Sequence, residues 1–387
     1  MMIYFDNAAT TPVLPEVRRV IDETLETLWG NPSSLHRKGF EAEKILRKAR
    51  ETVAGILRVD PKSVIFTSGA TESINTVLRG VAARHLMTRN GAPANVVISS
   101  VEHAAVEQTA RALKDFGIDV RRASVDEAGR VDAADMAALV DAHTLLVGMM
   151  HVNNELGTIY PIADIVRAVK ARKADVPVLV DGTQALGKLV VHPGELGCDY
   201  YVSSGHKIHA PKGIGLLYVR PGAFFRPLLT GGPQENGHRA GTENVPYIAG
   251  FAAALEAMEA SREGDWNPTI VAINRSVRER LAASDARILS PEEASPYILT
   301  AAFSGIKAEV LLHFMEREEM YLSSGSACSK GAPSRVLQAI RVPDAYADGA
   351  VRLSFGRENT LNEVDPFLDQ LLAAVRQIQS LTGGHKA

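Results

Sequence analysis

Cysteine is scarce in this chain of 387 residues, which contains two, Cys198 and Cys328. Two cysteines in a chain of this length do not form a disulfide framework, so the sequence favours a reducing compartment. Long apolar runs are also missing, and none reaches the roughly 18 residues that a membrane-spanning helix needs. The opening MMIYFDNAATTP lacks the basic region and the apolar stretch of a secretory signal. We therefore expect a cytoplasmic protein without a membrane partner.

An excess of positive charge is absent as well. The chain has 42 basic and 45 acidic residues, which gives a net charge of −3. Nucleic-acid-binding proteins usually show a basic excess or stripe, so we expect no nucleic-acid partner. The hydrophobic share of 46% and the charged share of 22% are typical of a soluble globular protein. The length exceeds what one ordinary hydrophobic core supports, which predicts two domains.

Short apolar, β-branched runs alternate with helical patterns between about residues 60 and 220. This alternation predicts an α/β fold, in which a large domain has a mostly parallel seven-stranded sheet flanked by helices. The predicted strands are 63–67, 95–99, 119–123, 144–149, 177–181, 200–203 and 214–219. The predicted helices are 39–57, 71–86, 103–115, 132–141 and 161–173.

After about residue 220 the pattern changes, and the last part of the chain reads as a smaller α+β unit. A segment rich in Gly, Pro and polar residues, 221–247, comes first and is typical of a functional loop. We place the large domain at 15–258, and the small domain at 259–387 together with residues 1–14. The predicted helices here are 246–262, 267–283, 307–317, 334–340 and 361–381, and the predicted strands are 297–304, 319–323 and 350–354.

Polar residues follow five of the predicted strands at their carboxyl ends. Ligands of open α/β sheets bind beyond this edge of the sheet. The convergence of five such strand ends therefore predicts a functional site. The residues concerned are Thr71, His103, Asn154, Asp181 and the group Ser204, His206 and Lys207.

Lys207 lies just past a buried strand, in the run SSGHKIHAPKGIG. Most lysines are solvated surface residues, but a lysine held in a cleft has a lowered pKa and can form a Schiff base. Schiff-base lysines bind pyridoxal 5'-phosphate, and such sites pair the lysine with an acid that holds the pyridine nitrogen. Asp181, about one strand–helix–strand unit earlier, is the candidate acid. Taken alone it would be a turn residue, and its pairing with Lys207 favours the cofactor role.

A phosphate group needs hydrogen-bond donors, which FTSGATESIN can supply. This run predicts a strand, a turn of small residues and a helix beginning near Ala70 and Thr71, whose backbone N–H groups suit an anion. Ser204 and His206 would add donors. The plainer interpretation of this run is an ordinary helix N-cap.

Three further residues could contact the cofactor ring or the substrate. His103 could stack on the ring and exchange protons, or it could be a core or helix-start residue. Gln184 could bond the phenolic oxygen of the ring. Asn154 could meet either that oxygen or a substrate carboxylate.

The two cysteines lie in different surroundings. Cys198, in LGCDYYV, fits the usual fate of a free cysteine, which is burial as a small apolar residue. Cys328 lies among serines and glycines in SSGSACSKGAP, which indicates an exposed, reactive thiol.

Ten runs of this sequence are similar to motifs of one enzyme family. With them the chain resembles the cysteine desulfurases of the NifS/IscS type, within the fold-type-I pyridoxal-phosphate enzymes of the class V aminotransferase superfamily. The resemblance covers nearly the whole chain, and SGHK with PKG, followed by SGSAC, is its most specific part. The runs are YFDNAATTP, GNPSSLHRKG, FTSGATESIN, EHAAV, MHVNNELGT, VDGTQALGK, SSGHKIHAPKGIG, RAGTEN, SSGSACS and VRLSFGR.

The resemblance implies a role for each motif residue. Lys207 holds the cofactor covalently, Asp181 faces the pyridine nitrogen, Gln184 contacts the ring hydroxyl and His103 stacks on the ring. Arg352 and Asn154 would clamp the substrate carboxylate, because the guanidinium fork pairs bidentately with it. The phosphate would be held by Ala70, Thr71, Ser204, Gly205 and His206, and by Thr242 of a neighbouring subunit in a homodimer.

The implied reaction converts L-cysteine to L-alanine. Lys207 removes the α-proton, and Cys328 attacks the sulfur and keeps it as a persulfide. A sulfur-acceptor protein would then receive the sulfur for iron–sulfur clusters or other thio-cofactors, and Cys328 could be a transient iron–sulfur ligand during transfer.

Other functions remain open at this point. One is another pyridoxal-phosphate reaction, such as selenocysteine lysis, a different C–S lyase activity or transamination; transamination would leave Cys328 without a purpose. A non-enzymatic platform would not need Lys207 and Asp181. A metal role for His206, His209 and His238 lacks a recognisable ligand motif, so no metal is expected.

Overall fold

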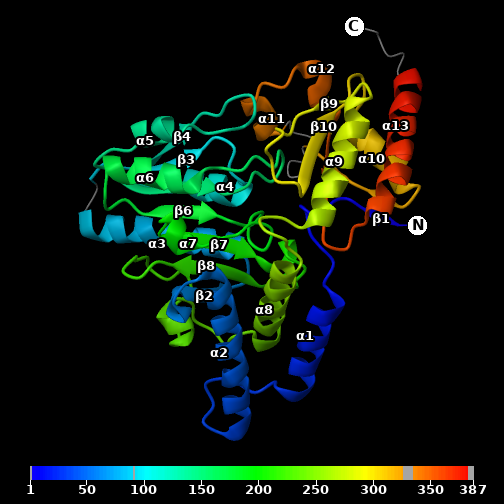
Figure 1. The fold of residues 1–387 in the computed structure, drawn as a ribbon. Helices are drawn as coiled ribbons and strands as arrows, with labels where there is room; N and C mark the ends of the chain where they lie inside the picture. Colours follow the sequence, from blue (N-terminus) through cyan, green and yellow to red (C-terminus); the bar gives the residue numbers. More distant parts are fainter. Residues whose placement is uncertain (1, 90–91, 326–333, 382–387) are drawn as a thin grey trace.

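The computed structural model describes residues 2–89, 92–325 and 334–381, and its largest element is a seven-stranded sheet (Figure 1). The strand order is β2-β8-β7-β6-β5-β3-β4; β8 is antiparallel to both neighbours, and the other neighbouring pairs are parallel. Each predicted strand of this region is present, which confirms the mostly parallel sheet. The strands are β2 (Val64–Thr67), β3 (Ala94–Ser99), β4 (Ile118–Ala123), β5 (Thr144–Met150), β6 (Val178–Asp181), β7 (Tyr200–Ser204) and β8 (Gly215–Val219).

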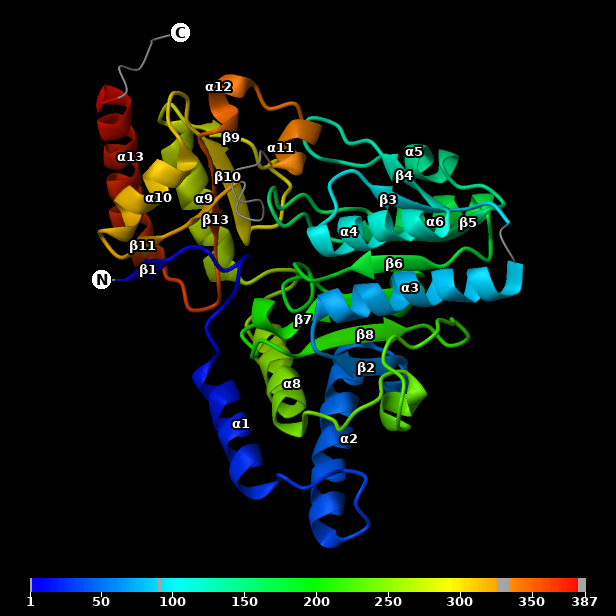
Figure 2. The same cartoon turned by 180° about the vertical axis from the view of Figure 1, so that it is seen from behind.

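The sheet is buried on both faces, because its central strands are apolar at successive positions. Val96 and Ile98 of β3 join a cluster with residues of α3 and α4, whereas Val97 between them belongs to the cluster on the opposite face. Alternate residues of a strand point to opposite faces, so this run of apolar residues needs cover on both sides. Figure 2 shows α3 and α4 lying across one face. The helices of this part are α1 (Pro15–Thr27), α2 (Arg37–Leu57), α3 (Ala70–Arg89), α4 (Ala104–Ala112), α5 (Ala133–Ala138), α6 (Ile162–Arg172), α7 (Pro193–Leu196) and α8 (Val245–Ala260).

The C-terminal unit is built on a four-stranded antiparallel sheet of order β12-β13-β10-β9. The first strand of the chain, β1 (Ile3–Tyr4), pairs in parallel with β11 (Met320–Tyr321), so residues 3 and 4 lie against this unit. The boundary placed at 258/259 falls in the last turn of α8 and stays a prediction. The other elements are α9 (Pro268–Ala282), β9 (Arg287–Ile288), β10 (Ile298–Ala302), α10 (Ala308–Glu316), β12 (Ser323–Ser324), α11 (Arg335–Ala339), α12 (Asp344–Ala347), β13 (Ala350–Ser354) and α13 (Val364–Leu381).

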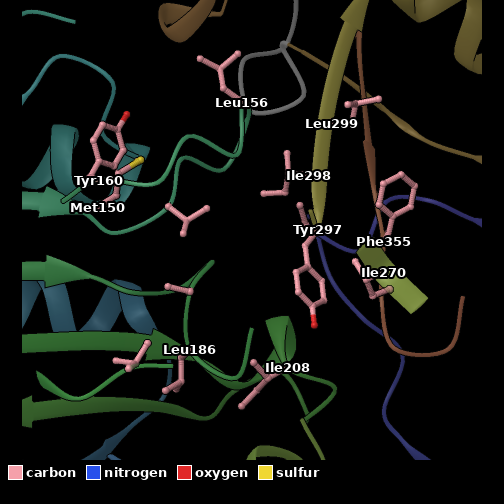
Figure 3. Close-up of a cluster of buried hydrophobic side chains, with 14 of the residues drawn as sticks. Met150, Leu156, Tyr160, Leu186, Ile208, Ile270, Tyr297, Ile298, Leu299 and Phe355 are labelled. Carbon is pink, nitrogen blue, oxygen red and sulfur yellow. The ribbon is translucent and has the colours of Figure 1, made fainter. Parts of the chain in front are cut away.

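One hydrophobic cluster joins the large sheet to the C-terminal unit. In Figure 3, the Tyr297 ring extends toward Ile208, which comes from the segment that follows β7, and both residues belong to the same cluster. This shared core fixes the C-terminal unit beside the carboxyl ends of the strands. No helix in the described part of the chain combines the length and apolarity that crossing a membrane requires.

Candidate active site

A cavity of about 520 Å³ lies at the carboxyl ends of the strands. Its lining includes residues from the ends of β2, β3, β5, β6 and β7, so the structure brings together the five strand ends that the sequence singles out. Ten of the predicted site residues line it: Ala70, Thr71, His103, Asn154, Asp181, Gln184, Ser204, His206, Lys207 and Arg352.

Lys207 and Asp181 line this same cavity from neighbouring strands β7 and β6. The Lys207 amine donates hydrogen bonds to the carbonyl oxygens of Ala8 (2.6 Å) and Ala9 (2.7 Å). Asp181 is buried, and its Oδ1 accepts a hydrogen bond from the Thr183 N–H at 3.0 Å. The amine is therefore inside the site, where a Schiff-base lysine must be, and is held there by backbone acceptors.

The backbone after Asp181 can pass close to the Tyr201 ring because residue 182 is glycine. A Cβ at Gly182 would lie 2.0 Å from ring atoms of Tyr201, far inside van der Waals contact. Tyr201 is itself fully buried and its hydroxyl pairs with His151 Nδ1 at 3.0 Å. The backbone just after Asp181 thus packs against the buried ring of Tyr201.

The start of α3 forms one end of the cavity. Gly69 adopts a φ of +155°, and Gly215 of β8 approaches it so closely that a Cβ on Gly215 would lie 2.4 Å from the Gly69 Cα. Ser204 lies beside the same turn, because a Cβ on Gly69 would meet its Oγ at 3.4 Å. Thr71 in the first turn and Ser204 therefore surround the backbone N–H groups that a helix start offers to an anion.

Both histidines at the cavity are uncharged at neutral pH. Burial, together with the positive charges of Lys207 and Lys212, lowers the pKa of His206 to about 4. Burial also lowers the pKa of His103, an effect that Asp181 opposes and Lys207 reinforces. His103 Nδ1 accepts from the Ala105 N–H at 3.1 Å, so it caps α4 while it lines the cavity. Because a neutral imidazole carries one proton, this leaves Nε2 as the protonated nitrogen.

The Gln184 side chain makes hydrogen bonds with two other groups of the site. Its Nε2 donates to the Ala8 carbonyl at 2.9 Å, the same oxygen that receives Lys207. Its Oε1 accepts from the Nζ of Lys188, also at 2.9 Å. Lys188 is 3% exposed, and its Nζ lies 5.6 Å from the ring centre of Tyr297.

Arg352 reaches the cavity from β13 of the C-terminal unit. Its Nη2 donates to Asp6 Oδ1 and its Nη1 to the backbone oxygen of Asn154, both at 2.9 Å. Its buried Nε has no hydrogen-bond partner in the described part of the chain. Burial raises the pKa of Asp6, and the charge of Arg352 opposes that rise.

Two predicted site residues, Gly205 and Thr242, are placed elsewhere, and a third is not described. Gly205 is buried under the cavity, where a Cβ would meet Ile214 Cγ2 at 2.8 Å. Thr242 lines a separate cavity of about 150 Å³, which shares Ser68 and Gly213 with the larger one. Cys328 lies outside the described residues, so its assigned role stays a prediction.

The segment that carries Thr242 is anchored by a buried ion pair. Arg50 donates to both carboxylate oxygens of Glu235, at 2.7 and 2.8 Å, and Glu235 also accepts from the Phe66 N–H at 3.0 Å. Only 2% of the Glu235 side chain is exposed. This pair ties the 221–247 segment to β2.

Several groups in or next to the cavity were not found from the sequence. The carbonyls of Ala8 and Ala9, the carboxylate of Asp6 and the buried amine of Lys188 all act on predicted site residues. The hydroxyl of Thr183 lines the cavity and is buried without a hydrogen-bond partner among the described residues. The run YFDNAATTP contained a signal for the first three, since it was among the motifs of the resemblance.

The remaining histidines and Cys198 have structural contacts. His209 accepts from the Arg357 N–H, and both His209 and His238 lie within hydrogen-bonding distance of backbone oxygens. In the described residues, no group of three or more His, Cys, Asp or Glu is placed to hold a metal. Cys198 is fully buried, and burial raises the pKa of its thiol, which fits the apolar role predicted for it.

Comparison with known proteins agrees with this geometry. The family model of the class-V aminotransferases matches residues 3–367. The chain is 41% identical to a NifS/IcsS protein homolog of Lactobacillus delbrueckii subsp. bulgaricus, over 95% of each chain. It is 37% identical to a cysteine desulfurase of Trichormus azollae, covering 98% of this chain and 94% of that one.

Among solved structures, a NifS-like protein matches with a TM-score of 0.90 and 36% identity, covering 97% of this chain and 100% of the other. The pyridoxal-phosphate fold predicted from the sequence is therefore confirmed. The chain belongs to the class-V aminotransferase family and, within it, to the cysteine desulfurases of the NifS type.

Proposed function

We propose that this protein is a pyridoxal-phosphate-dependent cysteine desulfurase, which converts L-cysteine to L-alanine and passes the sulfur to Cys328. The observation that carries the proposal is the meeting of the Lys207 amine, the Asp181 carboxylate and the open start of α3 at one cavity. These are the groups that an aldehyde, a pyridine nitrogen and a phosphate need, and each comes from a different strand end.

The lining residues fit pyridoxal phosphate in their chemistry. Lys207 would hold the aldehyde carbon, Asp181 the ring nitrogen and Gln184 the phenolic oxygen, while Ala70, Thr71, Ser204 and His206 would hold the phosphate. The buried, unpartnered hydroxyl of Thr183 on the cavity wall is a further donor awaiting an acceptor. When bound, the cofactor supplies a ring that accepts electrons from the α-carbon of the substrate.

The substrate carboxylate would bind Arg352. Its buried Nε lacks a partner among the described residues, and a buried donor without a partner costs about 1–3 kcal/mol. A substrate carboxylate on the Nε side of the guanidinium would accept a hydrogen bond from Nε and would compete with Asp6 for the adjacent Nη2. Asn154 holds the other side of the guanidinium through its backbone oxygen and so orients it.

Lys207 would then move the proton of the substrate α-carbon. The carbonyl oxygens of Ala8 and Ala9 hold its Nζ, which keeps the amine at the cavity wall and fixes the direction of the side chain. His103, uncharged and protonated on Nε2, faces the same cavity and could exchange a proton there.

The flanks of the segment that contains Cys328 support its role as sulfur acceptor. On one side, Ser323 of β12 is the register partner of Arg352 in β13. On the other side, the Ser334 hydroxyl donates to Glu155, next to Asn154, at 2.5 Å. Both flanks are therefore fixed near the substrate-binding residues. The Cys328 thiolate would attack the substrate sulfur, the C–S bond would break, and the carbon would take up a proton to give alanine.

We further propose a homodimer, in which Thr242 serves the cavity of the neighbouring subunit, and a cytoplasmic sulfur-acceptor protein. Thr242 does not line the larger cavity of its own chain, so a role at a phosphate requires a second subunit. The acceptor must offer a nucleophile, such as a thiolate, to take the outer sulfur atom of a persulfide.

The test uses three variants of the purified protein. The wild type incubated with pyridoxal phosphate should turn yellow, and with L-cysteine should give sulfide and alanine in the presence of a thiol reductant. Lys207→Ala should lose the visible band. Cys328→Ala should keep the band and give no sulfide, whereas the matched Cys198→Ala should keep both. A colourless wild type would refute the proposed function, and normal desulfuration by Cys328→Ala would refute the assigned thiol.

A further inference from the structure

A buried lysine behind the cavity has no part in the reaction described above. Lys188 does not line the cavity but lies one residue layer deeper, where its amine bonds Gln184 and faces the ring of Tyr297. A buried ammonium is costly unless its contacts compensate. Burial, together with the positive charges of Lys207 and Arg352, lowers the pKa of Lys188 to about 7.

The backbone directs this side chain inward. Gly187, which precedes Lys188, has a φ of +72° and packs against Ile208 and Met258, where a Cβ would lie 3.1 and 3.2 Å from their side-chain atoms. The left-handed turn favours glycine. In Figure 3, the Tyr297 ring points from the C-terminal unit toward the part of the large domain that carries Ile208, and the Lys188 Nζ lies 5.6 Å from the centre of this ring. The lysine is therefore enclosed between both parts of the molecule.

Lys188 constrains Gln184 through the chemistry of its amine. In its protonated form the Lys188 amine only donates hydrogen bonds, and it donates to the Gln184 oxygen here, whereas a backbone carbonyl only accepts them. Lys188 thus requires the oxygen of the Gln184 amide, and Ala8 requires its nitrogen. An amide carries two N–H groups, and Ala8 takes one, so the second is available to a group in the cavity that Gln184 lines.

We propose that Lys188 is a positioning residue, which fixes the direction of the Gln184 amide so that Gln184 donates into the cofactor cavity. The inference rests on the proposed function and concerns the phenolic oxygen of the cofactor. A reversed amide would present an oxygen both to the Ala8 carbonyl and to the phenolic oxygen, and would bring an N–H group against the Lys188 amine. Lys188 therefore acts on the cofactor through Gln184 and never by contact.

The test is a double-mutant cycle on pyridoxal-phosphate affinity, measured by titrating the full-length apo-protein and following the visible absorbance. Lys188→Met and Gln184→Ala should each weaken binding about tenfold, the effect of losing one hydrogen bond. The double variant should bind like Gln184→Ala alone, because Lys188 has no other path to the cofactor. Lys188→Arg, which keeps a donor-only side chain, should restore most of the affinity.

Other results would overturn the proposal. One is that Lys188→Met binds pyridoxal phosphate as tightly as the wild type. The other is that the double variant loses about a hundredfold in affinity, because such a loss marks two independent effects. If Lys188→Met does not fold, Lys188→Gln replaces it, because the glutamine side chain is one bond too short to keep the contact with Gln184. Wild-type affinity for pyridoxal phosphate in Lys188→Gln would also refute the proposal. A wild type that binds no cofactor refutes the proposed function itself, so the two failures are distinguishable.

Discussion

Glu102 gives a sharp test of the electrostatics around the cavity. Its side chain is 2% exposed; Oε1 accepts hydrogen bonds from the Ser99 hydroxyl at 2.5 Å and the Met150 N–H at 3.0 Å. Its Oε2 is buried without a partner in the described part of the chain. Burial raises the pKa of Glu102 from 4.5 to about 8, and the charge of Asp181 contributes to the rise. At neutral pH the group is therefore a buried neutral acid.

The raised pKa makes stability depend on pH in a defined direction. Below pH 4.5 the acid is protonated in both the folded and the unfolded chain, and its contribution is fully present. Between pH 4.5 and about 8 the unfolded chain loses the proton while the folded chain keeps it, so the free energy of unfolding falls as pH rises. The slope is about 1.4 kcal/mol per pH unit, and the whole window amounts to about 5 kcal/mol at most. Glu102→Gln keeps the shape and removes this slope.

Guanidinium unfolding of the apo-protein between pH 5.5 and 7.5 measures the effect. The free energy of the wild type should fall relative to Glu102→Gln by about 1.4 kcal/mol per pH unit. The matched control is Glu107→Gln, five residues further along the chain in α4. Burial raises the pKa of Glu107, but Arg122 and Arg335 outweigh this and hold it below its usual value, so its removal should shift the curve without changing its slope in this range. Parallel curves for the wild type and Glu102→Gln would refute the reasoning.

Three further predictions concern groups around the site. Arg352→Lys should raise the KM for cysteine roughly 10- to 100-fold through loss of the guanidinium fork, with the visible band unchanged; an unchanged KM in steady-state assays would argue against carboxylate binding. Glu235→Ala should lower the free energy of unfolding by about 3–5 kcal/mol in urea titrations, because the largely buried Arg50 loses its carboxylate partner; a loss below 1 kcal/mol would contradict this. Gly182→Ala should destabilise by about 1–3 kcal/mol through its clash with Tyr201, and wild-type urea stability would show that the ring can move.

The strands and the edge that carries the site were predictable because both depend on local patterns. A buried parallel strand needs an apolar, β-branched run, and the rule that ligands bind at the carboxyl ends then places His103, Asp181 and Lys207 together. The two-residue strands β1 and β9 were missed, since their pairing is decided by distant segments. Helix α1 was missed although Pro15 at its start and the buried Val17 and Ile21 carry a helical signal.

Other parts of the site have no signature in the sequence. The carbonyl oxygens of Ala8 and Ala9 are backbone atoms, so no residue type identifies them as the partners of Lys207. The burial of Lys188 depends on how Tyr297 of the C-terminal unit packs onto the segment after β6, which is a tertiary effect. Arg352 was predicted only through the family resemblance, because its cavity position depends on the pairing of β13 with β10 and β12.

The pairing of β1 with β11 has a consequence for biosynthesis. Ile3 must wait for Met320 before its strand can form, and the carbonyls that receive Lys207 lie only a few residues beyond Ile3. At ~5–20 residues per second on the ribosome, this delay is roughly 15 to 60 seconds. During that time β1 has no partner strand. The cavity at the end of the large sheet is therefore completed only after the C-terminal unit, which also supplies Arg352, has been synthesised.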